Sequence, residues 1–108
     1  LDMTGTLPTT AEVKKFLADT SKDKRQRKID ELLKRPAYAA WWATKLCDFT
    51  GNNNDSLTNV VPRGNGVTRT ASQDWYEWIK LRIAENIPYD ELVAGVANNE
   101  PAVRIEYQ

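Results

Sequence analysis

The chain has 108 residues, enough for one domain that buries roughly 65% of its extended-state surface. Fifteen basic residues balance fifteen acidic ones, which argues against a nucleic-acid or anionic-membrane domain, because such domains carry a basic excess. The chain has no histidine. This excludes histidine-based general-base catalysis, most zinc sites and the Cys-x-x-Cys-His attachment of haem c within the segment.

The first helix is predicted to begin after Thr9. Thr9 and Glu12 have the spacing of a capping box, with Thr at the N-cap and Glu at the third helical position. Val13, Phe16 and Leu17 then recur at helical spacing and form an apolar stripe.

A second helix is predicted over residues 22–34, with Ser21 as its N-cap. Its apolar residues are few, namely Ile29, Leu32 and Leu33, and its polar face is rich in Lys and Arg. That face could be a basic patch for phosphate or nucleic acid. The acidic residues among the bases, and the absence of aromatic residues between them, favour an ordinary solvated helix face.

Pro36 suits the first turn of a third helix, which is predicted to run to about Phe49 and to end before Gly51. Cys47 is the only cysteine, so it forms no internal disulfide, and we expect it buried in this helix. An aromatic cluster can be a sugar platform, but here we expect it in the core. The cluster consists of Tyr38, Trp41, Trp42 and Phe49, with Leu46 on the same face.

A long irregular stretch over residues 51–71 follows. Loops of this length are usually functional or disordered. A small hairpin could form here, with residues 59–61 and 67–69 flanking an Asn65-Gly66 turn.

Two more helices are predicted. The fourth covers residues 73–86 with Ser72 as its cap, and the fifth covers residues 89–97 after Pro88. Residues 103–107 alternate apolar and charged side chains, as in a short strand or a frayed end. The fold class is therefore all-α: about five helices in a small irregular bundle. The inner face of the fourth helix is predicted to hold Trp75, Trp78, Ile79, Arg82 and Ile83.

No apolar run approaches the ~20 residues that span a bilayer, so no membrane insertion is predicted. The chain begins at Leu1, in the middle of a motif, and Met3 is a poor initiator. We therefore expect residues 1–108 to be a single helical domain of a larger multidomain protein.

Four stretches in order resemble the DUF1549 family, the PSCyt2-like helical domain of large planctomycete-type proteins that also carry cytochrome c-like modules. Residues 1–17 resemble its opening "LDLTG-LPPTPEEV-FL", and residues 29–43 resemble its "VDRLLASPRYGERWA" helix pair. Residues 75–79 resemble "YRDWVI", and residues 86–93 resemble "NMPYDQFVREQLAGD". The chain departs from the family's "WLDLARYADS" over residues 46–54.

This resemblance implies an extracytoplasmic setting in a bacterium, and neighbouring haem or carbohydrate-related modules in the whole protein. The family has no established activity. The leading interpretation is a non-catalytic scaffold or interaction domain without a cofactor of its own, whose partners are other domains of the parent protein. The alternatives are a carbohydrate-binding module and a carboxylate-dependent hydrolase.

Candidate ligand-binding residues come from the central loop and its borders. Asn and Arg side chains can bond sugar hydroxyls, and Trp or Tyr rings can stack on a sugar. A surface loop packed on the rest of a larger protein is the plainer interpretation. We assign no catalytic residue and no metal ligand. The candidate ligand-binding residues are Asp48, Asn53, Asp55, Arg63, Arg69, Trp75 and Tyr76.

Two other chemistries are weaker. A hydrolase would require Asp48, Asp55 and Asp74 to converge, although Asp74 also suits a helix N-terminus. Residues 52–56 offer oxygen ligands for Ca²⁺ but lack EF-hand spacing and its final Glu.

Overall fold

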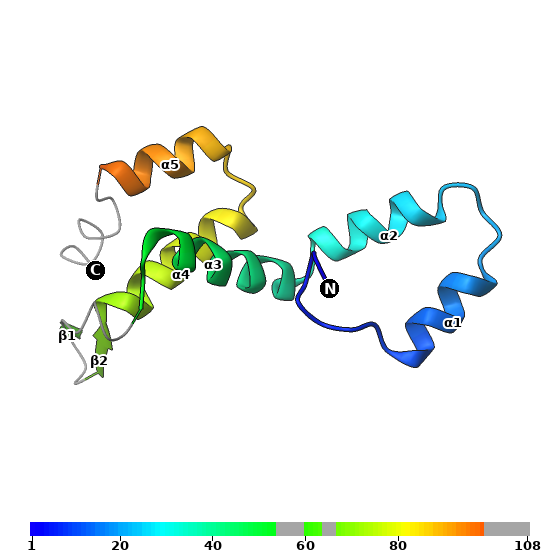
Figure 1. Ribbon diagram of the computed structural model, residues 1–108, viewed down its shortest axis with the longest axis horizontal. Coiled ribbons are helices and arrows are strands. Elements are labelled where there is room, and N and C mark those ends of the chain that lie inside the picture. The colour runs from blue at the N-terminus through cyan, green and yellow to red at the C-terminus, as the bar shows by residue number, and fades with distance from the viewer. Residues whose placement is uncertain (54–59, 64–66, 99–108) are drawn as a thin grey trace.

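The computed structural model describes residues 1–53, 60–63 and 67–98. It contains five helices and one two-stranded sheet (Figure 1). This confirms the all-α class and the number of helices. In chain order the elements are α1 (Thr10–Ala18), α2 (Lys24–Leu33), α3 (Pro36–Thr50), β1 (Val60–Arg63), β2 (Val67–Thr70), α4 (Ala71–Ala84) and α5 (Tyr89–Ala97).

Local capping explains where α1 and α4 begin. The Thr9 hydroxyl accepts from the Glu12 N–H at 3.2 Å, and the Glu12 carboxylate accepts from the Thr9 N–H at 2.9 Å. This confirms the predicted capping box. The cap predicted at Ser72 is wrong, because Thr70 and Gln73 form a capping box and α4 begins two residues earlier than predicted.

Two predicted helix bounds are also wrong. The second helix begins at Lys24 because the Ser21 N–H donates to the Asp19 carboxylate in a turn, so Ser21 does not cap α2. The fourth helix ends at Ala84, and Asn86 adopts a left-handed conformation with φ of 54°. An L-residue in that conformation cannot continue a right-handed helix.

The core lies where α3 packs on α4. Its buried cluster comprises Ala43, Cys47, Trp78 and Ile79, and Ile79 is fully buried. Alanine at position 43 leaves room for the large Trp78 side chain, so the two helices approach closely. The burial of Cys47 is confirmed. Val96 of α5 packs against the same cluster.

The predicted hairpin is confirmed between α3 and α4. Strands β1 and β2 pair antiparallel, with Val60 opposite Thr70 and Arg63 opposite Val67. Gly51 ends α3 at φ of 73°, the left-handed conformation that glycine adopts without strain. The predicted strand or frayed end at 103–107 lies outside the described residues.

Helices α1 and α2 extend to one side of the α3–α4 pair (Figure 1). The radius of gyration is 17.5 Å, and the longest dimension is 53 Å. A compact chain of this length would have a radius of gyration of about 13 Å. Neither α1 nor α2 contains a buried residue. The molecule therefore has a packed half and an elongated arm.

The aromatic cluster predicted for the core is only partly buried. Tyr38, Trp41 and Trp42 are partly exposed, and Phe49 is 76% exposed. The prediction is wrong for Phe49, because the face of α3 that packs on α4 is filled by the small residues Ala39, Ala43 and Cys47.

Candidate functional site

The N-terminal segment, α1 and α2 together form a ring. In Figure 1 the chain starts beside the α2–α3 junction, runs out to α1 and returns along α2. A tight turn opens it, with the Gly5 N–H donating to the Leu1 carbonyl at 2.7 Å. Gly5 has φ of 69°, and a Cβ there would lie 2.6 Å from the Trp41 ring of α3. Only glycine permits this close approach, which holds the start of the chain against α3.

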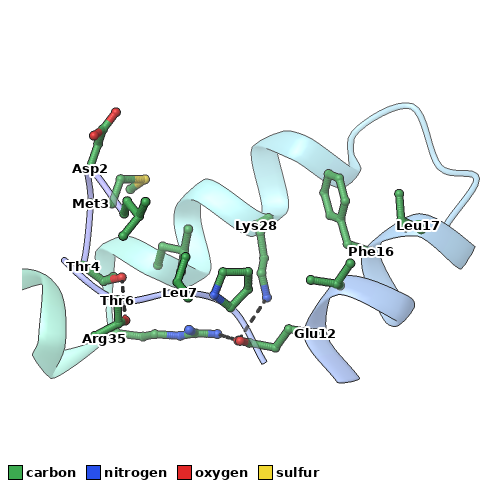
Figure 2. A pocket seen from close by; sticks show the side chains of 14 residues that line it. Asp2, Met3, Thr4, Thr6, Leu7, Glu12, Phe16, Leu17, Lys28 and Arg35 are labelled. Carbon is green, nitrogen blue, oxygen red and sulfur yellow. Dashed lines mark hydrogen bonds and ion pairs between the residues drawn. The ribbon is translucent and has the colours of Figure 1, made fainter. Parts of the chain in front are cut away.

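A pocket of about 440 Å³ lies inside this ring, which we call the ring pocket (Figure 2). Its walls are mostly apolar and include Met3, Phe16 and Leu32. Leu7 and Leu17 also line it, yet they are 76% and 70% exposed. Large apolar side chains around an open pocket are typical of a binding surface.

Glu12 is the centre of the charged wall of the ring pocket. Its carboxylate accepts from the Thr9 N–H and from Arg35, and Lys28 lies 3.6 Å away (Figure 2). Arg35 also donates to Glu31 at 2.5 Å. These contacts hold α1 to α2 through ion pairs, since the two helices bury no side chain between them.

The Thr9 N–H bond, followed by the Arg35 bond, lowers the pKa of Glu12 to about 2. The bonds to Glu31 and Glu12 raise the pKa of Arg35. Both groups therefore stay charged around neutral pH, and the Glu12 carboxylate is too weak a base for general-base catalysis. The Glu12, Lys28 and Arg35 charges of the pocket wall are engaged with one another, and most of the remaining wall is apolar, so the pocket suits an apolar group.

A second concavity, of about 370 Å³, lies between α3, the end of α4 and α5; we call it the aromatic groove. Its wall includes Trp42, Phe49 and Tyr89, and among the described residues that line it none is charged. Phe49 and Tyr89 are 76% and 72% exposed.

The predicted ligand-binding residues fall into separate places. Asp48 is exposed near the end of α3, and the Asn53 amide donates to the Gly51 carbonyl at 3.5 Å. Asp55 lies outside the described residues, and Arg63 lies in β1 with its side chain outside the described part.

The other predicted residues belong to β2 and α4. Arg69 lies 3.8 Å from the carboxylates of Asp74 and Glu77, and Asp74 is buried. Trp75 and Tyr76 are partly buried against the core cluster. The structure therefore brings Arg69 and Asp74 together and packs both rings on the core.

Comparison with known proteins identifies the family. The family model PSCyt2, "Protein of unknown function (DUF1549)", matches residues 1–102. The chain belongs to this family. No curated protein and no solved structure matches the chain. The resemblance predicted from the four stretches is thereby confirmed.

Within this PSCyt2 chain, no group of three or more His, Cys, Asp or Glu side chains among the described residues could hold a metal ion. No helix in the described part is long and apolar enough to cross a membrane.

The ring pocket is not predicted by the sequence, because the local signals in residues 1–17 indicate only a helix start. A signal was present. Leu1, Met3 and Leu7 are apolar residues in a segment without helical periodicity, and several apolar side chains close together outside a helix can mark an interaction surface.

Proposed function

We propose that this PSCyt2 domain is a non-catalytic scaffold that binds other protein domains through the ring pocket. One observation carries the proposal: Leu1, Leu7 and Leu17 line the ring pocket and are each at least 69% exposed. A partner that covered them would gain ~25 cal/mol for each Å² of apolar surface removed from water. The mutual pairing of Glu12, Lys28 and Arg35 in the pocket wall favours binding over chemistry.

The wider setting is part of the same proposal. We propose that the parent protein is extracytoplasmic and haem-associated, which rests on the family resemblance alone. The haem would be held by other domains, since the chain has no histidine.

Cysteine labelling tests the scaffold role. In the isolated domain, a Leu17→Cys variant should react rapidly with a thiol reagent, because position 17 is 70% exposed and Cys47 is buried. In the parent protein the same introduced cysteine should be protected. A Leu81→Cys variant is the matched control, because Leu81 is 46% exposed and lies on α4, away from the ring.

Equal labelling of the Leu17→Cys variant in the domain and in the parent protein would contradict the proposal. So would a haem Soret band in the purified domain, or turnover of a polysaccharide by it.

Carbohydrate binding is a second candidate, favoured by the aromatic groove. Exposed aromatic rings in an uncharged concavity suit a neutral sugar, whose apolar ring face stacks on them. Neutral oligosaccharides should then shift the tryptophan fluorescence, and a Trp42→Ala variant should lose the shift. The absence of a shift with every neutral sugar tested would remove this candidate.

A further inference from the structure

Apolar packing between the two helices of the arm is slight. Helices α1 and α2 contain no buried residue, although Phe16 of α1 and Leu32 of α2 both line the ring pocket. Both side chains stay partly exposed. In the packed half, by contrast, Ile79 of α4 is fully buried in the cluster that α4 shares with α3. Burial of apolar surface therefore stabilises the contact between α1 and α2 much less than the contact between α3 and α4.

Ion pairs join α1 to α2 at both ends of their contact. The Glu12 carboxylate of α1 pairs with Arg35, just beyond the end of α2, and lies 3.6 Å from the Lys28 ammonium (Figure 2). After the end of α1, the Asp19 carboxylate lies 2.8 Å from the Arg27 guanidinium. We call these five residues the charge latch. Their side chains are between 23% and 56% exposed, so water and salt ions reach every pair.

Lys24 of α2 adds a contact of the same kind. Its ammonium donates to the Phe16 carbonyl at 3.3 Å and lies 4.6 Å from the centre of the Phe16 ring. A cation over an aromatic ring is attracted electrostatically, and the attraction is weak where solvent reaches it. The contact between α1 and α2 therefore depends on charge more than on packing.

Exposed segments connect α1 to the rest of the ring on both sides. Residues 6–9 precede the helix and residues 20–23 follow it, and all of them are exposed. Segments with few buried contacts change conformation at low cost, and lids are drawn from such segments. Before them, Thr4 is buried and Gly5 lies against Trp41 of α3. Helix α1 can thus move while the start of the chain and α2 keep their places.

We propose that α1 is a lid on the ring pocket and that the charge latch holds it closed. The inference rests on the proposed function, because it concerns how the same pocket is opened to its partner. Displacement of α1 exposes Phe16 and Leu32 fully, and so adds apolar surface for a partner to cover. A partner that covers both side chains binds the open form better and shifts the population toward it.

Ionic strength sets the fraction of open molecules. Exposed ion pairs stabilise a contact only slightly even in dilute salt. The Debye length then shrinks from about 10 Å at 0.1 M salt to about 3 Å at 1 M salt, which weakens such pairs further. Salt should therefore favour a partner that covers the apolar surface of the open ring, whereas it would release a partner held by charge.

Distances between two spin labels on the whole chain test the proposal. One pair replaces Ala11 of α1 and Leu33 of α2 with Cys, at exposed and uncharged positions outside the charge latch. Thr44→Cys with Leu81→Cys is the matched control, because it spans α3 and α4. Brief labelling leaves the buried Cys47 unreacted. Between about 0.1 M and about 1 M salt, distances in the first pair should lengthen and broaden, and those in the control should stay unchanged.

Charge reversal within the charge latch gives a test at constant salt. In dilute salt, an Arg35→Glu variant should show the long distances that the wild type shows in concentrated salt, because Glu12 and Glu31 both pair with Arg35. Adding Glu12→Lys to this variant restores a pair of opposite charges and should restore the short distances. The control pair should give the wild-type distance in both variants, which shows that the packed half is folded.

Nile red, an uncharged apolar dye, reports the surface that the open lid exposes. In dilute salt its fluorescence should be higher with the Arg35→Glu variant than with the wild type, and the double variant should return it to the wild-type level. Equal fluorescence of the Arg35→Glu variant and the wild type would overturn the inference, because no apolar surface would then be uncovered.

The spin-label distances can overturn the inference in three ways. The wild-type pair could keep its distances in concentrated salt, the Arg35→Glu variant could keep the short distances, or the double variant could keep the long ones. In each case the charge latch would not be what closes the ring. None of these measurements requires a partner, so labelling of the Leu17→Cys variant in the parent protein decides the proposed function separately.

Discussion

Replacement of Ile79 measures how much of the stability resides in the α3–α4 interface. Ile79 is 0% exposed, so Ile79→Ala removes three fully buried carbons. At ~0.8 kcal/mol for each carbon the transfer loss is about 2.4 kcal/mol. The cavity left between the helices adds to this, which places the total at about 2–5 kcal/mol. Ile79→Val removes one carbon and should cost about 0.5–1.5 kcal/mol.

Leu17→Ala is the matched comparison. It also removes three carbons, but from a side chain that is 70% exposed. Its effect should stay within about 0.5 kcal/mol, as for other surface substitutions. Urea unfolding of the three variants, followed by tryptophan fluorescence, gives the free energies. If Leu17→Ala destabilised the domain as much as Ile79→Ala, the arm would be part of the core in solution, and the reasoning about an open ring pocket would fail.

Three further predictions concern acid, glycine and cysteine. Since the folded pKa of Glu12 is about 2 against 4.5 for an ordinary Glu, the stabilisation by its carboxylate is complete above pH ~4.5 and is lost as the pH falls toward 2. Circular dichroism at 222 nm should show a loss of helix in that pH window. A Glu12→Gln variant keeps the capping box and should show a smaller loss of helix there. An acid transition unchanged in this variant would contradict the role given to the Glu12 carboxylate. Gly5→Ala should displace the N-terminal segment from Trp41 and so change the tryptophan fluorescence. Gly51→Ala should lower the free energy of unfolding by only about 1–2 kcal/mol, the cost of a left-handed backbone, because nothing lies within 4 Å of a Cβ at this position. Burial raises the pKa of the Cys47 thiol, so iodoacetamide should label it slowly in the folded domain and rapidly in urea; equal rates would show that the thiol is accessible.

Helix positions could be predicted from the sequence where a local signal determines them. The Thr9–Glu12 capping box, Pro36 and Gly51 act within one turn of the chain, and the structure confirms all three. The start of α4 was missed because Thr70 and Ser72 are both good N-caps. The Gln73 side chain decides between them, because it accepts a hydrogen bond from the Thr70 N–H and so makes Thr70 the N-cap.

The candidate site was less predictable, because it depends on how distant segments meet. The prediction placed ligand binding around the central loop, and the structure finds the open apolar surface at residues 1–17. Periodicity assigns Leu17 a helical phase but cannot tell which element covers it. Trp75 and Tyr76 were candidates for their ring chemistry, and their packing on the core follows from the pairing of α3 with α4.

Apart from Thr4, every buried side chain of the described structure lies between Ala39 and Leu92. The packed half is therefore encoded by one uninterrupted stretch of chain, and the arm precedes it. Insertions, deletions or sequence drift in the arm would leave that stretch intact. A protein lineage could thus alter what the ring pocket recognises without rebuilding the part of the domain that makes it fold.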